Sequence, residues 1–433
     1  MTKPLIPALA ETPVASREIW SWAMYDFANS GYTTVVITAI FNAFFVSVIA
    51  GGADWATLLW TSIVAISFAI VMVVGPVLGA WADRRAAKKK VLAISTIGCV
   101  AATLALAPIA AQGGALLWLA CIVFIASNVF YALGENFTAA FLPELADSKD
   151  IAKISAWGWS LGYVGGLLTL GACLWLVTAE QARGATAVQY VPWTLVITAT
   201  IYALASLPIF IFLRERAVPK PELPPQSLIN GLKHSFAKLK HHPDLSRFFW
   251  AGLAYQAGLS VVITLASVYA EQALGFKMAD TIKLLLVVNV SAAIGAFIFG
   301  YVQDKIGHKT TLSITLVMWI ATVLIAYFWH TQNGFWVAAN FAGLCLGASQ
   351  SGGRALVGVM SPKAQTAEFY GLWGFVVRLS GIIGPMLYGL VTWLTEGNHR
   401  LALLITGSMF VIGLYLLRAV DVNRAEEAAN AAS

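Results

Sequence analysis

Residues 79–90 read GAWADRRAAKKK, and residues 300–309 read GYVQDKIGHK. In both stretches a glycine stands four positions before an aspartate, and basic residues follow that aspartate. Gly79 and Gly300 lie 221 residues apart, and so do Asp83 and Asp304. Each stretch closes a long apolar segment, so the pattern marks the same point in two related parts of the chain. An internal repeat of this kind is typical of transporters built from repeated helix bundles.

The composition predicts a chain that is surrounded by lipid. Hydrophobic residues make up 59% of the sequence and charged residues only 11%, whereas a soluble globular protein carries roughly 25% charged residues. A helix that crosses a bilayer needs about 20 apolar residues. Segments of this length are predicted at 21–49, 57–81, 90–111, 115–140, 153–178, 191–213, 247–271, 281–303, 310–330, 334–358, 366–394 and 400–418.

These segments predict an all-α membrane protein with twelve transmembrane helices in two six-helix, pseudo-symmetric halves. We expect residues 1–213 to form the N-terminal half and residues 247–433 the C-terminal half. Residues 214–246 form a hydrophilic linker, in which apolar residues recur at helical spacing among lysines. This linker is interpreted as an amphipathic helix at the membrane surface. A tether between the halves is preferred over a regulatory role.

The basic residues predict the orientation. With the N-terminus inside, 21 of the 27 basic residues fall on the cytoplasmic side and four fall outside. Cytoplasmic loops of membrane proteins carry such an excess of lysine and arginine. We therefore expect a multi-pass protein of the bacterial inner membrane with both termini in the cytoplasm. The net charge of +6 is attributed to these loops and not to nucleic-acid binding.

The repeated motif predicts a latch on the inner face. Glycine allows a neighbouring helix to approach closely, and an aspartate at a helix end can meet the positive N-terminus of another helix. The basic residues are expected to stay with lipid headgroups. A plain tight turn would explain one copy, but two copies at equal offset favour a latch formed by Gly79, Asp83, Arg84, Gly300, Asp304 and Lys305.

The motif also resembles the major facilitator superfamily, whose loops after helices two and eight carry Gly-x-x-x-Asp-Arg/Lys-x-Gly-Arg/Lys-Arg/Lys. The second copy matches well, whereas the first has Ala86 in place of the glycine. Residues 25–30, YDFANS, resemble a narrower branch that includes fungal vacuolar amino-acid effluxers and many bacterial proteins of unknown substrate. The resemblance implies a transporter with the major facilitator fold and leaves its substrate open.

Four charged residues lie inside predicted spans, where each costs about 2.5–3.5 kcal/mol on insertion scales. Asp26 and Glu135 are in the first half, and Arg354 and Arg378 are in the second. Opposite charges on opposite halves suit ion pairs that form and break as the halves move. With nearby polar and aromatic residues, the candidates for substrate binding or coupling are Tyr25, Asp26, Asn29, Tyr32, Asn128, Tyr131, Glu135, Trp159, Tyr163, Gln350, Arg354 and Arg378.

Each of the four charges also has a structural interpretation. Asp26 could cap the start of the first span, and Glu135 could stabilise helix packing. Arg378 could form a fixed internal salt bridge. Arg354 could pair with a cytoplasmic acid such as Glu368.

The leading hypothesis is a secondary active transporter of a small polar or zwitterionic solute, in particular an amino acid. Arg378 would bind a carboxylate, while Asp26 or Glu135 would bind an amine or carry a coupling proton. An exporter of drugs or organic anions is the alternative, and a membrane-embedded enzyme is a remote one. No metal-spaced histidine pair and no phosphate-binding loop occurs in the sequence, so no metal, cofactor or enzymatic activity is predicted. The expected partners are the small-molecule substrate, the bilayer and protons, for a monomer that does not bind nucleic acid.

Overall fold

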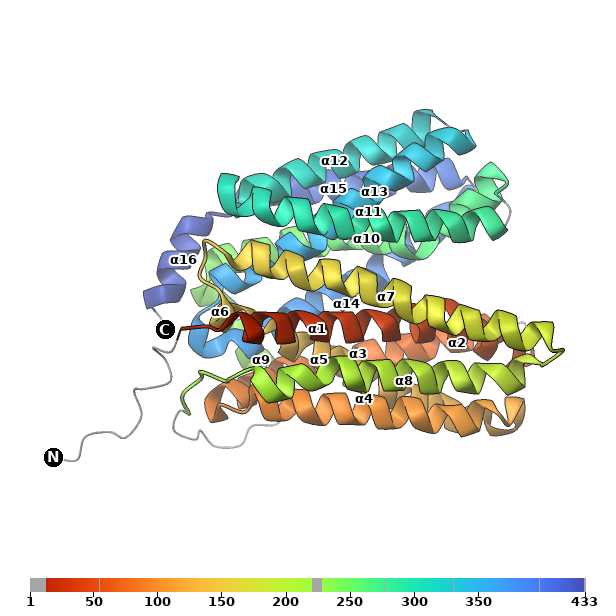
Figure 1. Ribbon diagram of the computed structural model, residues 1–433. Coiled ribbons are helices and arrows are strands. Elements are labelled where there is room, and N and C mark those ends of the chain that lie inside the picture. Colours follow the sequence, from red (N-terminus) through yellow and green to blue (C-terminus); the bar gives the residue numbers. More distant parts are fainter. Residues whose placement is uncertain are drawn as a thin grey trace.

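The structure is a computed structural model that describes residues 13–53, 55–219, 228–276, 278–329, 331–396 and 398–431. Over these ranges the chain forms helices and no strands (Figure 1). The long helices are α1 (Ser16–Tyr32), α3 (Ala56–Arg85), α4 (Lys88–Ala110), α5 (Leu117–Ala139), α7 (Ile151–Ala182), α8 (Ala187–Phe212), α10 (Pro243–Leu274), α11 (Met278–Ile306), α12 (His308–Phe328), α13 (Gln332–Met360), α14 (Thr366–Leu394) and α15 (His399–Leu417). Short helices are α2 (Ile40–Phe44), α6 (Leu142–Leu145), α9 (Leu228–Lys238) and α16 (Val422–Ala431).

Eleven of the long helices coincide with predicted spans to within a few residues, whereas the first predicted span, 21–49, is covered by α1 together with the helical residues that follow it as far as Ile49. Ten helical segments of the described chain are long and apolar enough to cross a membrane. The helices α10 and α13 are not among these ten, and the second half of α13 is almost completely buried by protein. A helix surrounded by protein can carry more small and polar residues than one that faces lipid. The all-α membrane class is confirmed.

The long helices form two groups, one above the other in Figure 1. In the first group α1 packs on α7 and α8, and α4 packs on α5 and α8. In the second group α11 packs on α13, and α10 packs on α14 and α15. The groups meet along two seams, one between α3 and α14 and one between α7 and α11.

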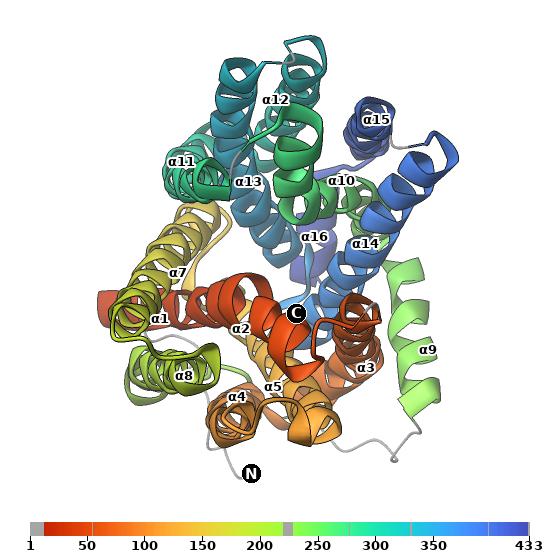
Figure 2. The ribbon, with the colours of Figure 1, turned by 90° about the vertical axis from the view of Figure 1, so that its right-hand side faces the viewer.

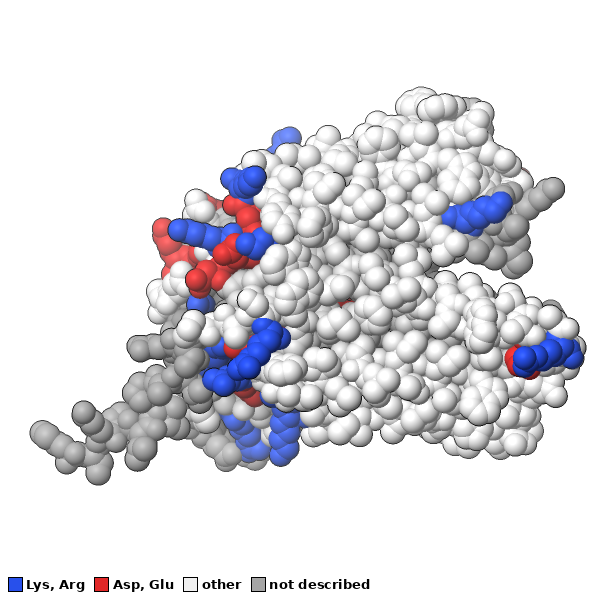
Figure 3. Space-filling model, in the orientation of Figure 1, with Lys and Arg blue, Asp and Glu red and all other residues white. Residues whose placement is uncertain are grey.

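The two ends of the bundle differ in charge. The space-filling view gathers Lys, Arg, Asp and Glu at the end where α1 begins and α16 lies, while the middle of the molecule is almost free of charge (Figure 3). We call this the charged end. At the opposite end the surface is hollowed by a notch between the two groups of helices (Figure 3).

The first span is not a regular α-helix. After α1, residues Thr33–Ala39 and Phe45–Ile49 are π-helical. The hydroxyls of Thr33, Thr34 and Thr38 donate hydrogen bonds to backbone carbonyls four or five residues earlier. Such bonds compete with the helical ladder and bend helices. Single π-helical turns inside α-helices are frequent at functional sites.

Candidate functional site

A cavity of about 720 Å³ lies between the two groups of helices. Its walls come from both groups, namely from α1, α5 and α7 on one side and from α10, α11, α12, α13, α14 and α15 on the other. Figure 2, viewed from the end opposite the charged end, shows these helices around the centre of the molecule. The volume falls within the roughly 300–1,000 Å³ of small-molecule sites.

Nine of the twelve candidate residues line this cavity. They are Asp26, Asn29, Tyr131, Glu135, Trp159, Tyr163, Gln350, Arg354 and Arg378. Candidates on α1 (Asp26 and Asn29) and on α5 (Tyr131 and Glu135) therefore reach the cavity.

Tyr25, Tyr32 and Asn128 do not line the cavity, because they are buried inside the first group of helices. The hydroxyl of Tyr25 lies 2.7 Å from that of Thr96, and the hydroxyl of Tyr32 lies 2.9 Å from that of Ser127. Sequence spacing puts these residues on a common face with cavity residues. It does not show which part of that face a neighbouring helix covers.

The first ion pair joins Asp26 of α1 to Arg354 of α13. Arg354 Nη1 donates to Asp26 Oδ2 at 2.6 Å, and its other two nitrogens donate to the Oγ and the carbonyl oxygen of Ser155 on α7. The guanidinium also lies over the rings of Trp22 and Trp159, at 4.7 and 5.4 Å from their centroids. All three nitrogens of Arg354 are thus engaged, and the pair links the two groups of helices.

This geometry corrects two structural interpretations. Asp26 does not cap the first span, because α1 begins at Ser16 and Asp26 lies in its third turn. Arg354 does not pair with Glu368, which binds Lys238 and Ser235 instead. The partner of Arg354 is 328 residues away in the chain, a separation at which sequence spacing gives no information.

The second ion pair joins Glu135 of α5 to Arg378 of α14. Arg378 Nη2 lies 3.3 Å from Glu135 Oε2 and also donates to the carbonyl oxygen of Ala132 at 3.2 Å. Its Nη1 donates to the carbonyl oxygen of Gly374 at 3.1 Å and to Asn136 Oδ1 at 3.4 Å. The side chain of Glu135 is 45% exposed and lines the cavity, while that of Arg378 is 6% exposed. This pair is longer and more open than the first.

Sequence reasoning missed several residues of the site. Ser155 and Trp22 hold Arg354, and Asn136 accepts from Arg378. Asn136 directly follows Glu135, so a search of the neighbours of each intramembrane charge would have found it. Ser155 and Trp22 carry no such signal, because only the packing of α1 and α7 against α13 brings them to Arg354.

The first copy of the repeated motif lies at the α3–α14 seam of the charged end. Asp83 accepts hydrogen bonds from the backbone N–H groups of Ala367 and Glu368, at 3.1 and 2.9 Å, in the first turn of α14. A side chain at Gly79 would clash, because an added Cβ would lie 2.3 Å from the carbonyl oxygen of Ala367. A carboxylate at the N-terminus of a helix satisfies free N–H groups and is favoured by the helix dipole.

The second copy repeats this arrangement at the α7–α11 seam. Asp304 accepts from the backbone N–H groups of Ala152 and Lys153, at 3.2 and 3.0 Å, in the first turn of α7. An added Cβ at Gly300 would lie 2.2 Å from Cβ of Ala156. Both aspartates therefore join one group of helices to the other at the charged end.

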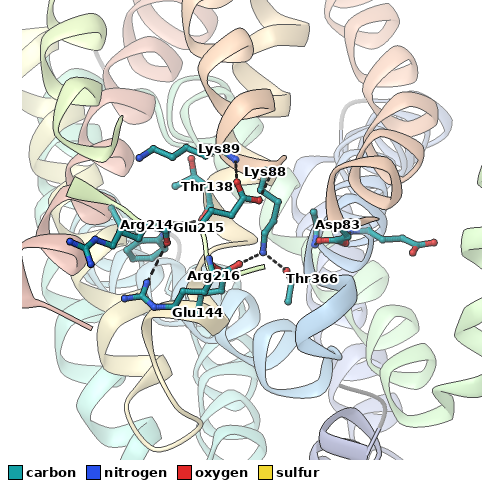
Figure 4. Close-up of polar contacts among 12 residues, drawn as sticks. Asp83, Lys88, Lys89, Thr138, Glu144, Arg214, Glu215, Arg216 and Thr366 are labelled. Atoms are coloured by element: carbon teal, nitrogen blue, oxygen red, sulfur yellow. Dashed lines mark hydrogen bonds and ion pairs between the residues drawn. The ribbon is translucent and has the colours of Figure 1, made fainter. Parts of the chain in front are cut away.

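The basic residues of the motif differ among themselves. Arg84 is half-buried and Lys305 is exposed. The expectation that all of them stay with headgroups is wrong for Lys88, whose side chain is 0% exposed. Lys88 pairs with Glu144 and donates to the hydroxyl of Thr366 in the second group of helices at 3.0 Å (Figure 4). The carboxylate of Glu144 offsets the cost of burying this ammonium.

Ala86 occupies the position where the resembled motif has glycine. It ends α3 with φ 49° and ψ 53°, which is the left-handed region that residues with a Cβ rarely adopt. Gly307, the corresponding residue of the second copy, has φ 92°. The first loop thus keeps a positive φ even though it lacks the residue best suited to it.

A further ion pair recurs in each group. Near the start of α1, Glu18 binds the guanidinium of Arg216 at 2.9 Å and accepts the backbone N–H of Arg214, just after α8. In the first turn of α10, Asp244 binds Arg424 at 2.7 Å and accepts the backbone N–H of Asp421, just after α15. Each pair ties the first helix of a group to the chain that follows its sixth.

Asp244 lies at the charged end, ahead of the apolar segment that begins at residue 247. Hydrogen bonds from Arg424, the Asp421 N–H and Arg247 hold the pKa of Asp244 down to about 2. Its side chain is 3% exposed.

Comparison with known proteins identifies related sequences. The sequence model of the family described as "Vacuole effluxer Atg22 like" matches residues 56–430. The uncharacterized MFS-type transporter YxiO of Bacillus subtilis is 30% identical over 408 residues, which are 92% of this chain and 93% of that protein. Autophagy-related protein 22 of Yarrowia lipolytica is 24% identical over 70% of this chain and 56% of its own length. The chain thus spans about half the length of these fungal relatives.

Solved structures confirm the fold. The human organic anion transporter MFSD10 superimposes with a TM-score of 0.74 over 95% of this chain and 100% of that one, at 13% identity. The transporter FucP in its outward conformation gives a TM-score of 0.74 over 94% of this chain and 98% of that one, also at 13% identity. At such identities the similarity shows the fold alone, which is the expected major facilitator fold.

Breaking the Asp26–Arg354 pair should destabilise the protein strongly. We expect Arg354→Ala to cost about 3–5 kcal/mol, because it leaves a buried carboxylate unpaired. The double variant Asp26→Asn/Arg354→Met should recover much of this loss, since it removes both charges. Thermal unfolding of the purified protein in detergent measures the effect. An equal loss of thermal stability in the single and double variants would show that the unpaired carboxylate is not the cause of the destabilisation.

Replacing Ala86 with glycine should stabilise the protein. The left-handed conformation costs a residue with a Cβ about 1–2 kcal/mol, and glycine loses about 0.5–1 kcal/mol in conformational entropy. A net gain on the order of 0.5–1 kcal/mol should raise the thermal unfolding midpoint. The matched control is Ala111→Gly, at φ −65°, which should be neutral or destabilising. A lower midpoint for Ala86→Gly would contradict this account.

The Asp244 pair should make stability depend on acid pH. The folded-state pKa of about 2 lies below the unfolded value of about 3.9. The pair therefore contributes stability above pH 4, and this contribution is lost as pH falls toward 2. Asp244→Asn should unfold at a lower temperature than the natural protein at pH 7, and the difference should shrink at pH 3. The exposed Asp147→Asn is the control. A difference that stays constant with pH would refute the assignment.

Proposed function

We propose that this chain, which belongs to the vacuole effluxer Atg22-like family of MFS-type transporters, moves a small zwitterionic solute across a bacterial inner membrane. The solute proposed is in particular an amino acid. The chain is not an enzyme. It is a multi-pass membrane protein and a secondary transporter. The proposal concerns its substrate, its coupling and its orientation.

The observation that carries the substrate proposal is the Glu135–Arg378 pair in the cavity. An amino acid brings one carboxylate and one ammonium. Arginine is well suited to bind a carboxylate through two parallel hydrogen bonds, and the half-exposed Glu135 can accept the ammonium. The carboxylate of the substrate would take the place of Glu135 beside Arg378, and the ammonium of the substrate would take the place of Arg378 beside Glu135. Both buried charges would stay compensated, which keeps the desolvation penalty low.

The spare hydrogen-bonding capacity of Arg378 supports this assignment. Its Nε has no acceptor among the described residues, and its 3.4 Å contact with Asn136 is long for a hydrogen bond. Arg354 has an acceptor for each nitrogen. We therefore assign the carboxylate of the substrate to Arg378.

We assign a coupling role to Asp26. Its pair with Arg354 links α1 and α13 across the two groups of helices at the deep end of the cavity. Protonation of Asp26 would remove the ionic attraction and release Arg354. Proton uptake would thus be linked to a change in the contacts between the groups. Protons are accordingly proposed as the coupling ion.

The seams between the groups support alternating access. The Asp83 and Asp304 contacts close the charged end, while the cavity reaches residues near the opposite end such as Leu174 and Leu403. Because basic residues concentrate at the charged end (Figure 3), we place that end in the cytoplasm. The Asp83 and Asp304 contacts would then form a gate on the cytoplasmic side. One chain supplies both walls of the cavity, so we propose that the monomer is the working unit.

An organic anion is a second candidate substrate. Toward the opposite end the cavity is lined by apolar residues, among them Leu170, Leu174, Val261 and Leu285. Such a surface suits a larger apolar body attached to a carboxylate. Both candidates place the carboxylate on Arg378, and they differ in whether an ammonium on Glu135 is needed.

The first functional test is counterflow of labelled amino acids into proteoliposomes, with and without a pH gradient. We expect saturable uptake by the natural protein. Arg378→Ala should reduce it at least about 30-fold, which corresponds to the lower end of the 2–5 kcal/mol carried by a buried charged contact. Glu135→Gln should raise the apparent KM for amino acids. The matched control is Arg183→Ala, at an exposed site, which should transport normally.

The same assay separates the two candidates. Uptake of carboxylates without an amine, unaffected by Glu135→Gln, would favour the organic anion. Absence of uptake of every amino acid by a folded protein would exclude the amino-acid proposal. Uptake that does not depend on the pH gradient and is unchanged in Asp26→Asn would exclude the coupling role of Asp26.

A further inference from the structure

The linker helix α9 lies beside the seam between α3 and α14 (Figure 2). Its Gly231 faces α3, because an added Cβ would lie 3.1 Å from Cγ1 of Val77. The ring of Phe236 packs edge-on against that of Phe375 of α14, with centroids 5.1 Å apart. The helix α9 therefore contacts one helix from each group.

Glu368 connects α9 to the Asp83 latch. Ser235 Oγ donates to Glu368 Oε1 at 2.6 Å, and Lys238 Nζ donates to Oε2 at 2.5 Å. The backbone N–H of the same glutamate donates to Asp83 at 2.9 Å. One residue in the first turn of α14 thus binds the first group of helices through its backbone and the linker through its side chain.

The charges around Glu368 explain why the docking of α9 stabilises the closed seam. The side chain of Glu368 is 2% exposed, and its backbone binds the carboxylate of Asp83, so two acidic residues are buried close together. Like charges in a buried site disfavour each other's ionised form. Lys238 supplies the compensating charge for Glu368. If α9 left, Glu368 would lose the hydrogen bond from Ser235 and the ion pair with Lys238, and hydrogen bonds to a charged group are among the stronger ones. The closed seam is therefore more stable with α9 docked.

The start of the linker holds the other side of the same latch. The carboxylate of Glu215 accepts from the backbone N–H groups of Lys88 and Lys89, at 2.7 and 3.1 Å, at the N-terminus of α4. The backbone N–H of Arg216 donates to Glu144, which pairs with Lys88 (Figure 4). Lys88 in turn reaches Thr366, two residues before Glu368. Both ends of the linker thus contact the latch.

We propose that α9 is a strap that holds the charged end closed, and that this end opens only when Ser235 and Lys238 release Glu368. When the charged end opens, α3 and α14 must separate, and α9 cannot then keep its contacts with both. The docking free energy of α9 therefore sets part of the balance between the two states. This inference rests on the proposed alternating access and is independent of the substrate.

Distance measurement between two spin labels tests the strap. Labels are placed on Lys90→Cys and Ala419→Cys, two exposed positions at the charged end, one in each group, after replacement of the four buried native cysteines. We expect Lys238→Met to raise the ratio of the longer to the shorter distance about tenfold, as for the loss of one hydrogen bond to a charged group. Ser235→Ala should act in the same direction to a smaller extent.

Matched variants separate the strap from general effects. Lys233→Met removes an exposed lysine from the same helix and should leave the distances unchanged, while Lys238→Arg should behave as the natural protein. Unchanged distances in both Lys238→Met and Ser235→Ala, with normal thermal unfolding, would overturn the proposal, as would an equal shift in Lys233→Met. The measurement needs no substrate, so it remains informative if the uptake assay rejects every amino acid.

Discussion

A charge that leaves water for the interior of a helix bundle in lipid must find a partner, and the buried ion pairs of this protein follow from that constraint. An ionised group without compensation costs several kcal/mol in such surroundings. Asp26, Glu135, Arg354 and Arg378 meet the constraint by pairing across the two groups of helices. The pairs thus satisfy local electrostatics and at the same time join the two groups of helices.

The two pairs satisfy this constraint in different ways. The Asp26–Arg354 pair is short, held by Ser155 and enclosed by tryptophan rings. We propose that it is a structural link that must be neutralised before it opens. The Glu135–Arg378 pair is longer and faces the cavity, and we propose that a zwitterion exchanges with it. The two pairs thus differ in length and exposure, although each joins one carboxylate to one guanidinium.

At the charged end the pseudo-symmetry of the chain is close but incomplete. Asp83 and Asp304 bind equivalent helix N-termini, and Glu18 and Asp244 bind equivalent arginines. Only the first copy adds a buried lysine, Lys88, that reaches the second group. The linker also binds on this side, through Glu215 and through Lys238. The asymmetry gives the α3–α14 seam additional contacts beyond those the repeat provides.

The sequence alone determined the helices, the repeat and the aspartate contacts with helix N-termini. Hydropathy and helical periodicity are local properties, and the 221-residue offset of Gly79 and Gly300 is visible without coordinates. Only the tertiary structure decided that Arg354 pairs with Asp26 and not with Glu368, that Lys88 is buried, and that Tyr25 and Tyr32 face away from the cavity. These facts depend on which helix covers which face, and that is set by packing between segments that are far apart in the chain, from 56 residues for Lys88 and Glu144 to 328 for Asp26 and Arg354.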